Sequence, residues 1–336
     1  MRLFGPGARR LRMMPLGRRW ARAAALVAAL STLLSLLGGA GWLYLRHFET
    51  TITRVDAFSP IPAEERPAKA TGKALHILVA GTDQAGPSGG SQRTDTIILV
   101  RVSADGDRVH MVSIPRDTWT AVPTRVDSDD TRLAKINAAY AWGGTPLLVR
   151  TVEGFTGVRI DHAAVVDFAG FGRVIDSLGG VDVEVDKPYL SYAAGGITVP
   201  PGTRRMNSAM ALEYARERHQ FAAGDFTRIQ HQQAIIMAIL QAATRKGLLA
   251  DPARLDGFLD AVSGAVRVDA GLRVTDLVWR LRGVTADRIV MLTSPSAGVD
   301  MIGDQSVVLP DRPRAASLYR ALREGAVEQW LAENPH

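Results

Sequence analysis

The sequence predicts an α/β domain, a mixed central sheet covered by helices in an α-β-α sandwich, preceded by one transmembrane helix. From residue 75 onward, apolar β-branched runs of strand length are interleaved with segments of helical periodicity. A tight-turn motif joins two of those runs directly, which makes them antiparallel neighbours and the sheet mixed. Near the N-terminus, a long stretch without charged side chains has the length of a membrane span.

The predicted span covers residues 23–45, none of which is charged. At a rise of about 1.5 Å per residue, a helix of this length crosses a hydrocarbon core of about 30 Å. Trp42 and Tyr44 stand where interfacial aromatic residues belong. The alternative is a cleaved signal peptide with the small residues 38–40 as its processing site, but the apolar core of such a peptide is usually about 7–15 residues long. We therefore expect an uncleaved anchor.

Charge sets the orientation of this anchor. Arginines precede the span with no acidic residue among them, at positions Arg2, Arg9, Arg10, Arg12, Arg18, Arg19 and Arg22. Only Arg46 and then Glu49 follow it closely. Because the cationic flank of a span stays in the cytoplasm, residues 1–22 should form a cytoplasmic arm. The prediction is a single-pass protein of the cell membrane with its C-terminal domain outside the cytoplasm.

Composition excludes several classes of function. Those arginines account for the whole formal net charge of +6, so the rest of the chain has no basic excess of the kind that nucleic-acid-binding domains show. The chain has no cysteine, which removes disulfides, thiolate catalysis and cysteine-based metal sites. Its histidines are scattered without the close spacing typical of zinc ligands. We expect no nucleic-acid partner.

A proline-containing segment, residues 46–72, is predicted to be a tether between the anchor and the domain. Three strands should then follow, at 75–80, 96–102 and 109–114. The turn at 104–107 joins the last two as an antiparallel pair.

Helices and further strands occupy the rest of the chain. Thr145 and Pro146 resemble an N-cap and first helical position, and that helix should end before Gly157. Further strands are predicted at 160–167, 181–185 and 288–293, and further helices at 168–178, 208–215, 228–246, 251–264 and 311–324. We assign 73–250 to the catalytic part and 251–336 to the C-terminal part of the same domain.

Charged residues gather at the ends of the first three strands. Asp83 follows the first strand, Arg93 and Asp95 precede the second, and Arg116 follows the third. If the second strand runs antiparallel to both the first and the third, these side chains meet at one edge of the sheet. Carboxylates suit Mg²⁺ and guanidinium forks suit phosphate oxygens. The alternative is that the aspartates are ordinary turn residues and the arginines solvated surface charge.

A second polar set lies farther along the chain. Arg216 and Arg218 stand two apart, so they can converge on one ligand only where a helix ends. Asp225, Arg228 and Gln232 follow at the spacing of one helical face. The pattern is equally typical of a polar helix surface, and Lys135 is similarly ambiguous.

Taken in order, these motifs resemble the LytR–CpsA–Psr family of cell-wall glycopolymer ligases over about residues 73–245. The matching stretches are 79–83, 93–96, 113–118, 135–140, 176–182, 211–218 and 225–233. One position departs from the family pattern, since His231 stands where an arginine is common. A basic contact at this position is therefore either lost or dependent on pH, because imidazole titrates near neutrality.

The resemblance implies an enzyme that transfers a glycosyl phosphate from a polyprenyl-pyrophosphate-linked glycan to a peptidoglycan sugar hydroxyl. It implies Mg²⁺ (or Mn²⁺) on Asp83 and Asp95, either of which could serve as the base. It also implies pyrophosphate binding by a set of mainly basic residues, Arg93, Arg116, Lys135, Arg216, Arg218, Asp225 and Gln232. Arg116 joins the two aspartates as a predicted catalytic residue.

The same resemblance implies an apolar tunnel for the polyprenyl tail. The helical stripe Phe168, Phe171, Ile175 and Leu178, facing the strand 163–166, is the predicted wall. An ordinary helix-on-sheet core would show the same periodicity.

Three other functions remain open from the sequence. A non-catalytic module could bind the cell wall or polyprenyl phosphate, and a pyrophosphatase could use the same residues with water as acceptor. The family was also once described as transcription attenuators. The predicted orientation and the absence of a basic domain disfavour that function.

Overall fold

The computed structural model describes residues 49–69, 72–82, 94–217, 220–221, 224–244, 248 and 251–335. The predicted arm and span, together with Asp83, Arg93 and Arg218, lie outside these residues. Within the described part of the chain, no helix combines the length and the apolar character needed to cross a membrane.

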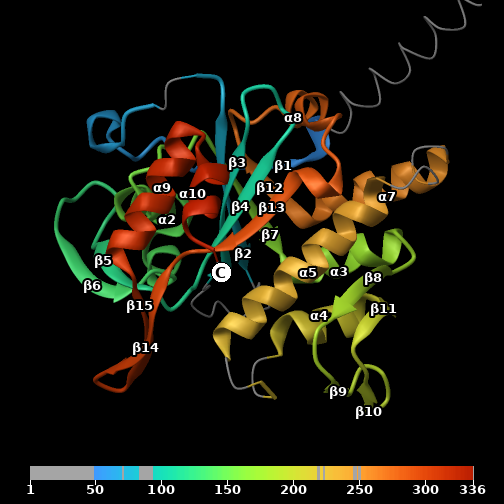
Figure 1. Cartoon of the computed structure of the whole chain (residues 1–336). Helices are drawn as coiled ribbons and strands as arrows, with labels where there is room; N and C mark the ends of the chain where they lie inside the picture. The colour runs from blue at the N-terminus through green and yellow to red at the C-terminus, as the bar shows by residue number, and fades with distance from the viewer. Residues whose placement is uncertain are drawn as a thin grey trace, which may run out of the picture. The chain divides into compact units, whose positions relative to one another are not determined.

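A seven-stranded mixed sheet forms the centre of the domain (Figure 1). In spatial order its strands are β1 (Thr53–Val55), β12 (Val266–Asp269), β7 (His162–Asp167), β2 (Leu75–Thr82), β3 (Thr94–Val102), β4 (Val109–Ile114) and β13 (Ile289–Thr293). The predicted hairpin is confirmed, because β3 and β4 pair antiparallel from Val102 opposite Val109 to Ile97 opposite Ile114. β2 is antiparallel to β3 and parallel to β7.

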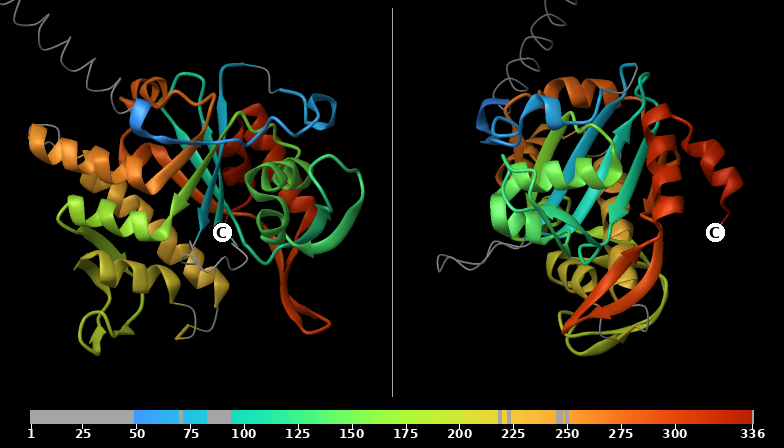
Figure 2. Two further views of the ribbon diagram at one scale, coloured as in Figure 1. Left: turned by 180° about the vertical axis from the view of Figure 1, so that it is seen from behind. Right: turned by 90° about the vertical axis from the view of Figure 1, so that its left-hand side faces the viewer.

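Helices cover both faces of this sheet, as predicted. One face packs against α2 (Ala138–Thr156), α9 (Arg312–Glu324) and α10 (Val327–Glu333). The other face packs against α5 (Asp225–Thr244), α7 (Pro252–Ala265) and α8 (Val274–Leu281). Successive side chains of β3 point to opposite faces of the sheet. Ile97 and Leu99 therefore pack on the face covered by α2, and Ile98 packs on the face covered by α8. Figure 2 (left) shows the sheet between the two helix layers.

Smaller elements surround the sandwich. The remaining helical segments are η1 (Ala63–Glu65), α3 (Phe168–Ser177), α4 (Ser208–Arg216) and η2 (Ala286–Arg288). Antiparallel strand pairs outside the central sheet are β5 (Trp119–Pro123) with β6 (Thr131–Lys135), β8 (Val181–Val185) with β11 (Gly202–Met206), β9 (Tyr189–Ser191) with β10 (Ile197–Val199), and β14 (Ser296–Ile302) with β15 (Gln305–Pro310).

The helix predicted to begin at Thr145 is part of a longer kinked helix. Gly143 and Gly144 of α2 have non-helical backbone angles, and a regular helix resumes after them. It ends where Gly157 adopts φ 65°, a left-handed cap that residues with a side chain rarely adopt.

The segment predicted to be a tether is instead folded into the domain from Glu49 onward. Its strand β1 pairs in parallel with β12, and Ile52, Ala57 and Ile61 are buried. Prolines and small polar residues suggested an exposed linker, but the apolar residues between them pack against the sheet layers. At most residues 46–48 are left to connect the predicted anchor to the described domain.

The predicted apolar stripe also packs differently from expectation. Ile175 is fully buried in a cluster with Val181, Val183 and Ile235, and Phe171 and Leu178 pack against that cluster. Strand residues 163–165 belong to other clusters. Phe171, Ile175 and Leu178 therefore pack with β8 and α5 rather than with β7, whereas Phe168 lies beside Gly81 of β2. Ile175 is fully buried in this cluster, and its role as a tunnel wall stays a prediction.

Truncating Ile175 tests this packing. Ile175→Ala removes a fully buried side chain, so we expect it to lower the free energy of unfolding by about 2–5 kcal/mol in chemical denaturation. Ile197→Ala is the matched control because that isoleucine is 57% exposed. Equal stability of the two variants would show that the site of Ile175 tolerates incomplete packing, as a tunnel wall does.

Candidate functional site

One edge of the sheet collects the predicted charged residues. β2 ends there at Thr82, β3 begins at Thr94, and β4 ends at Ile114. The register of β2 against β3 shifts between Gly81 and Thr82. A side chain at Gly81 would place its Cβ only 2.9 Å from the Cβ of Thr96, so the close approach of the two strands requires glycine.

Arg116 is the centre of the site. Its Nη1 donates to Asp95 Oδ1. Its Nε lies 3.5 Å from a carboxylate oxygen of Asp117 and 3.9 Å from one of Asp225. One guanidinium thus contacts carboxylates from the start of β3, from the loop after β4 and from the start of α5. The predicted meeting of Asp95 and Arg116 is confirmed, and Asp225 of the second polar set lies beside them.

Backbone bonds hold the loop that carries Arg116. The Arg116 carbonyl accepts a hydrogen bond from Asn137 N at 3.2 Å, and the Asp117 carbonyl accepts one from Val308 N at 2.9 Å. The β5–β6 hairpin also brings Lys135 to the site, with its Nζ 3.1 Å from Asp117. Lys135 therefore reaches Arg116 through a shared carboxylate, and the structure places both predicted residues together.

The first turns of α5 form the other wall. Arg228 is 5% exposed and pairs with Asp225 one turn before it. Gln232 accepts from the Thr96 hydroxyl at 3.0 Å and donates to the Ala215 carbonyl at 3.4 Å. In this structure Gln232 thus clamps α5 against β3 and the end of α4. Gln233 adds a bond from its amide to the Ser113 hydroxyl at 3.0 Å.

Burial and the neighbouring carboxylates act in opposite directions on the pKa values of Arg116 and Arg228. Burial alone would lower the pKa of Arg116, but the surrounding carboxylates, Asp95 foremost, raise it. Burial lowers the pKa of Arg228, and Asp225 only partly opposes that effect. Both remain cationic at any physiological pH because guanidinium loses its proton only in strong base.

The remaining predicted cations are less defined by the structure. Arg216 ends α4 with its guanidinium 5.5 Å from the ring centroid of Phe168, the first residue of α3. Phe168 in turn lies close to Gly81, at the site edge of β2. Arg216 therefore stands at the rim, and the roles of Asp83, Arg93 and Arg218 stay predictions.

His231 does not contact the charged cluster. Its ring stacks on Tyr214 with centroids 3.8 Å apart, and its Nδ1 lies 3.1 Å from the Tyr214 carbonyl. Burial lowers the pKa of His231, with Asp186 opposing. A residue buried as a neutral ring is a packing element that fixes α5 against α4, so the expected pH-dependent basic contact is not what the structure shows.

A pocket of about 770 Å³ opens beside the cluster. Arg116, Asp117, Lys135 and Asp225 line one side of it. The other walls come from the β5–β6 hairpin, the start of α2 and the β14–β15 turn, and include Trp119, Arg132, Trp142, Asp304, Gln305 and Ser306. A mostly polar pocket with a few aromatic groups at a charged sheet edge fits a polar ligand larger than a phosphate.

Two residues of the cluster, Asp117 and Arg228, are absent from the predicted site. Both had a signal, since Asp117 directly follows Arg116 and Arg228 shares a helical face with Asp225 and Gln232. The pocket wall formed by Asp304, Gln305 and Ser306 had no signal in the sequence, because the short β14–β15 hairpin carries no motif.

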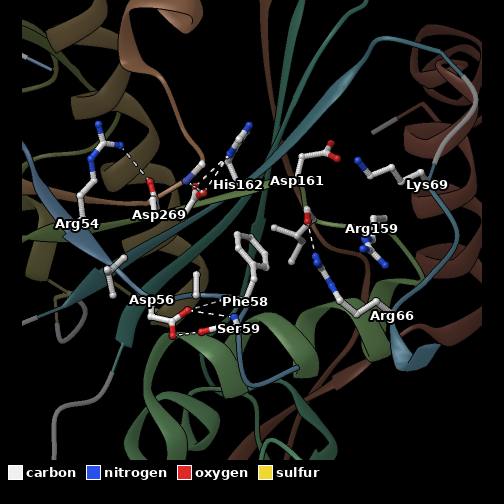
Figure 3. Close-up of a pocket in the computed structure, with 15 residues that line it drawn as sticks. Arg54, Asp56, Phe58, Ser59, Arg66, Lys69, Arg159, Asp161, His162 and Asp269 are labelled. Carbon is white, nitrogen blue, oxygen red and sulfur yellow. Dashed lines mark hydrogen bonds and ion pairs between the residues drawn. The ribbon is translucent and has the colours of Figure 1, made fainter. Parts of the chain in front are cut away.

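A second pocket, of about 610 Å³, lies at the opposite end of the sheet (Figure 3). Its charged groups are largely engaged in structural contacts. Arg66 binds Glu153 and the Ile160 carbonyl, and Asp269 accepts from backbone N–H groups and faces His162. This pocket lies beside β1, β7 and β12, and two of the cations that line it, Arg54 and Arg66, are bound to backbone carbonyls and to Glu49 and Glu153.

The matched family model is that of the LytR_cpsA_psr family, over residues 49–324. The chain belongs to this family. It is 30% identical over 273 residues to the cell wall biosynthesis protein LcpA of Corynebacterium glutamicum, a match that covers 72% of this chain and 49% of LcpA. It is 34% identical over 207 residues to the polyisoprenyl-teichoic acid–peptidoglycan teichoic acid transferase TagU of Halalkalibacterium halodurans, covering 61% and 63%. The chain thus spans about half to two-thirds of the length of these relatives.

Solved structures of the family share the fold. The crystal structure of TagV from B. subtilis has a TM-score of 0.63 and 29% identity, covering 76% of this chain and 98% of TagV. TagT bound to LIIa-WTA has a TM-score of 0.61 with 18% identity, covering 81% and 98%. At that identity the second match supports the fold alone.

Stability should depend on pH through His231. Because burial lowers its pKa from the ordinary 6.5, the folded state binds fewer protons than the unfolded state. The contribution of the neutral His231 ring to the free energy of unfolding is complete above pH 6.5 and is lost as the pH falls below that value. We expect the free energy of unfolding, measured by denaturant titration from about pH 7.5 to about pH 5, to fall less in His231→Gln than in the parent chain. His336→Gln is the control at the chain end, and a decline as steep in His231→Gln as in this control would contradict the assignment.

Proposed function

We propose that this chain is a membrane-anchored phosphotransferase of the cell envelope. It moves a glycosyl phosphate from a polyprenyl-pyrophosphate-linked glycopolymer to a peptidoglycan sugar hydroxyl, outside the cytoplasm. The observation that carries the proposal is Arg116 set among three carboxylates at the mouth of a polar pocket, in a member of this family. The teichoic acid transferase activity named for the TagU relative supports the reaction class.

Charge counting indicates what the donor requires. In the described cluster, the carboxylates of Asp95, Asp117 and Asp225 are matched in number by Arg116, Lys135 and Arg228. A pyrophosphate adds negative charge that this balanced set does not neutralise. The predicted cations Arg93, Arg216 and Arg218 and a divalent ion would supply the difference.

The site fits a divalent ion. Asp95 presents a carboxylate that is 29% exposed, beside the pocket that we assign to the donor. Thr82 precedes Asp83 in the sequence and pairs with Thr94 across β2 and β3, and the hydroxyls of both threonines are buried without a hydrogen-bond partner among the described residues. Hard oxygen donors of this kind suit Mg²⁺, and Mn²⁺ as well. Asp83 and Asp95 would hold the ion, which would neutralise charge on the phosphate oxygens.

Arg116 is the residue we expect to act most directly on the donor. Its fork can bind two phosphate oxygens at once, and its present carboxylate partners hold it in place until the donor arrives. The acceptor hydroxyl attacks the glycan-side phosphorus, and the bond to the bridging oxygen breaks. The hydroxyl proton passes to Asp83 or Asp95, and polyprenyl phosphate leaves.

The acceptor would enter through the far half of the pocket. Asp304, Gln305 and Ser306 offer groups that can bond sugar hydroxyls, and Trp119 and Trp142 offer aromatic surface. This wall adjoins the cluster, so a hydroxyl held there lies next to the donor phosphorus. A simple binding module would need the pocket but not the ring of carboxylates around Arg116.

Replacing Arg116 by lysine separates catalysis from stability. Arg116→Lys keeps a positive charge near Asp95 and Asp225 but loses the bidentate fork, so we expect a rate loss of about 100-fold or more with little change in melting temperature. The assay is transfer from a lipid-linked glycan to peptidoglycan fragments. Arg125→Lys, at an exposed arginine paired with Asp127, should keep the parent rate. A large fall in melting temperature with a proportional loss of folded protein would show that Arg116 is only a structural ion-pair partner.

A further inference from the structure

Helix α8 carries apolar side chains on its outer face. Trp279 is 70% exposed and Val278 is 54% exposed. The inner face of α8 is already buried, because Leu277 and Leu281 pack against the cluster of Ile77 and Ile98 on the sheet. Val278 and Trp279 are therefore not needed to bury α8 on the sheet. Two adjacent large apolar side chains in water indicate a contact surface.

This helix lies at the end of the sheet opposite the charged cluster. Arg280 donates to the carbonyls of Lys73, just before β2, and of Ser103, just after β3. The cluster lies at the other ends of the same two strands. Figure 1 shows α8 at the top of the domain and the β9–β10 and β14–β15 hairpins at the bottom.

The chain enters the domain at α8. Both carboxylate oxygens of Glu49, the first described residue, accept hydrogen bonds from the N-terminus of α8, at 3.1 Å from Val274 N and 3.0 Å from Thr275 N. Arg54 ties the same carboxylate to the Leu272 carbonyl. Glu49, four residues beyond the predicted anchor, is thus bound to the N-terminus of α8.

Covalent geometry then limits how far α8 can be from the bilayer. The predicted anchor ends at Leu45, so four Cα–Cα steps of about 3.8 Å, at most about 15 Å, separate it from Glu49. Trp279 lies only five residues along α8 from Val274, about 7.5 Å of helix. This bound holds for any conformation of the connecting residues.

The outer face of α8 has the chemistry of a bilayer interface. Tryptophan is favoured at the headgroup level, where its ring is partly apolar and its N–H can reach water. The guanidinium of Arg282 stacks 4.5 Å from the centroid of the Trp279 ring. Arginine in that position can donate to lipid phosphate oxygens while its neighbour inserts.

We propose that the outer face of α8, formed by Val278, Trp279 and Arg282, rests on the membrane surface. The contact orients the domain with its charged cluster away from the bilayer. The eight residues of β2 separate the two ends by about 26 Å. The proposal rests on the predicted anchor and is independent of the proposed transferase activity.

Site-directed spin labelling of the full-length chain tests the contact. The sequence has no cysteine, so Val278→Cys introduces a single labelling site next to an intact Trp279. Val299→Cys is the matched control, because that valine is 59% exposed on the hairpin at the opposite end. Both are reconstituted into nanodiscs of phosphatidylglycerol and phosphatidylethanolamine. Collision rates with lipid-soluble oxygen and with a water-soluble nickel chelate are then measured.

We expect a higher oxygen-to-nickel ratio at 278 than at 299. Adding Trp279→Gln to the Val278→Cys chain should lower that ratio toward the value at 299. Equal ratios at 278 and 299 would overturn the proposal, as would a higher ratio at 299. Failure of the full chain to enter nanodiscs would overturn it too, since the predicted anchor would then be wrong.

Discussion

The placement of Arg116 organises the rest of the site. Its side chain draws carboxylates from three separate segments to one point, while its backbone carbonyl is held by the start of α2. Because like charges would repel without it, the approach of Asp95, Asp117 and Asp225 depends on this guanidinium and on Arg228 and Lys135 beside it. In the proposed reaction, a donor phosphate would take over these contacts of Arg116.

The sequence predicts the parts of the structure that local patterns determine. The β3–β4 hairpin, the helix end at Gly157 and the convergence of Asp95 with Arg116 follow from turn chemistry and strand direction. Packing between distant segments leaves no such pattern. The burial of Ile52 and Ile61 in the expected tether, and of Ile175 against Ile235 of α5, depends on partners far away in sequence. The same reason explains the role of His231, whose ring stacks on Tyr214 and whose pKa is lowered by burial.

The two ends of the sheet are suited to different surroundings. One end carries the carboxylate and guanidinium cluster beside a polar pocket, and the other carries the entry of the chain at Glu49 and the exposed Trp279. With the proposed contact of α8, a lipid-linked donor would have to leave the headgroup level to reach Arg116. The acceptor polymer, in contrast, would meet the pocket on the side that faces the wall.

Transfer to a sugar rather than to water is the central claim, and oxygen isotopes test it most directly. The full chain is incubated in ¹⁸O-water with a polyprenyl-pyrophosphate glycan, peptidoglycan fragments and Mg²⁺, and the phosphate-containing products are analysed by mass spectrometry. We expect glycan phosphate joined to peptidoglycan and free polyprenyl phosphate, neither carrying ¹⁸O, with both products lost when the ion is chelated. Free glycan phosphate labelled with ¹⁸O, with no acceptor-linked product, would show a pyrophosphatase instead.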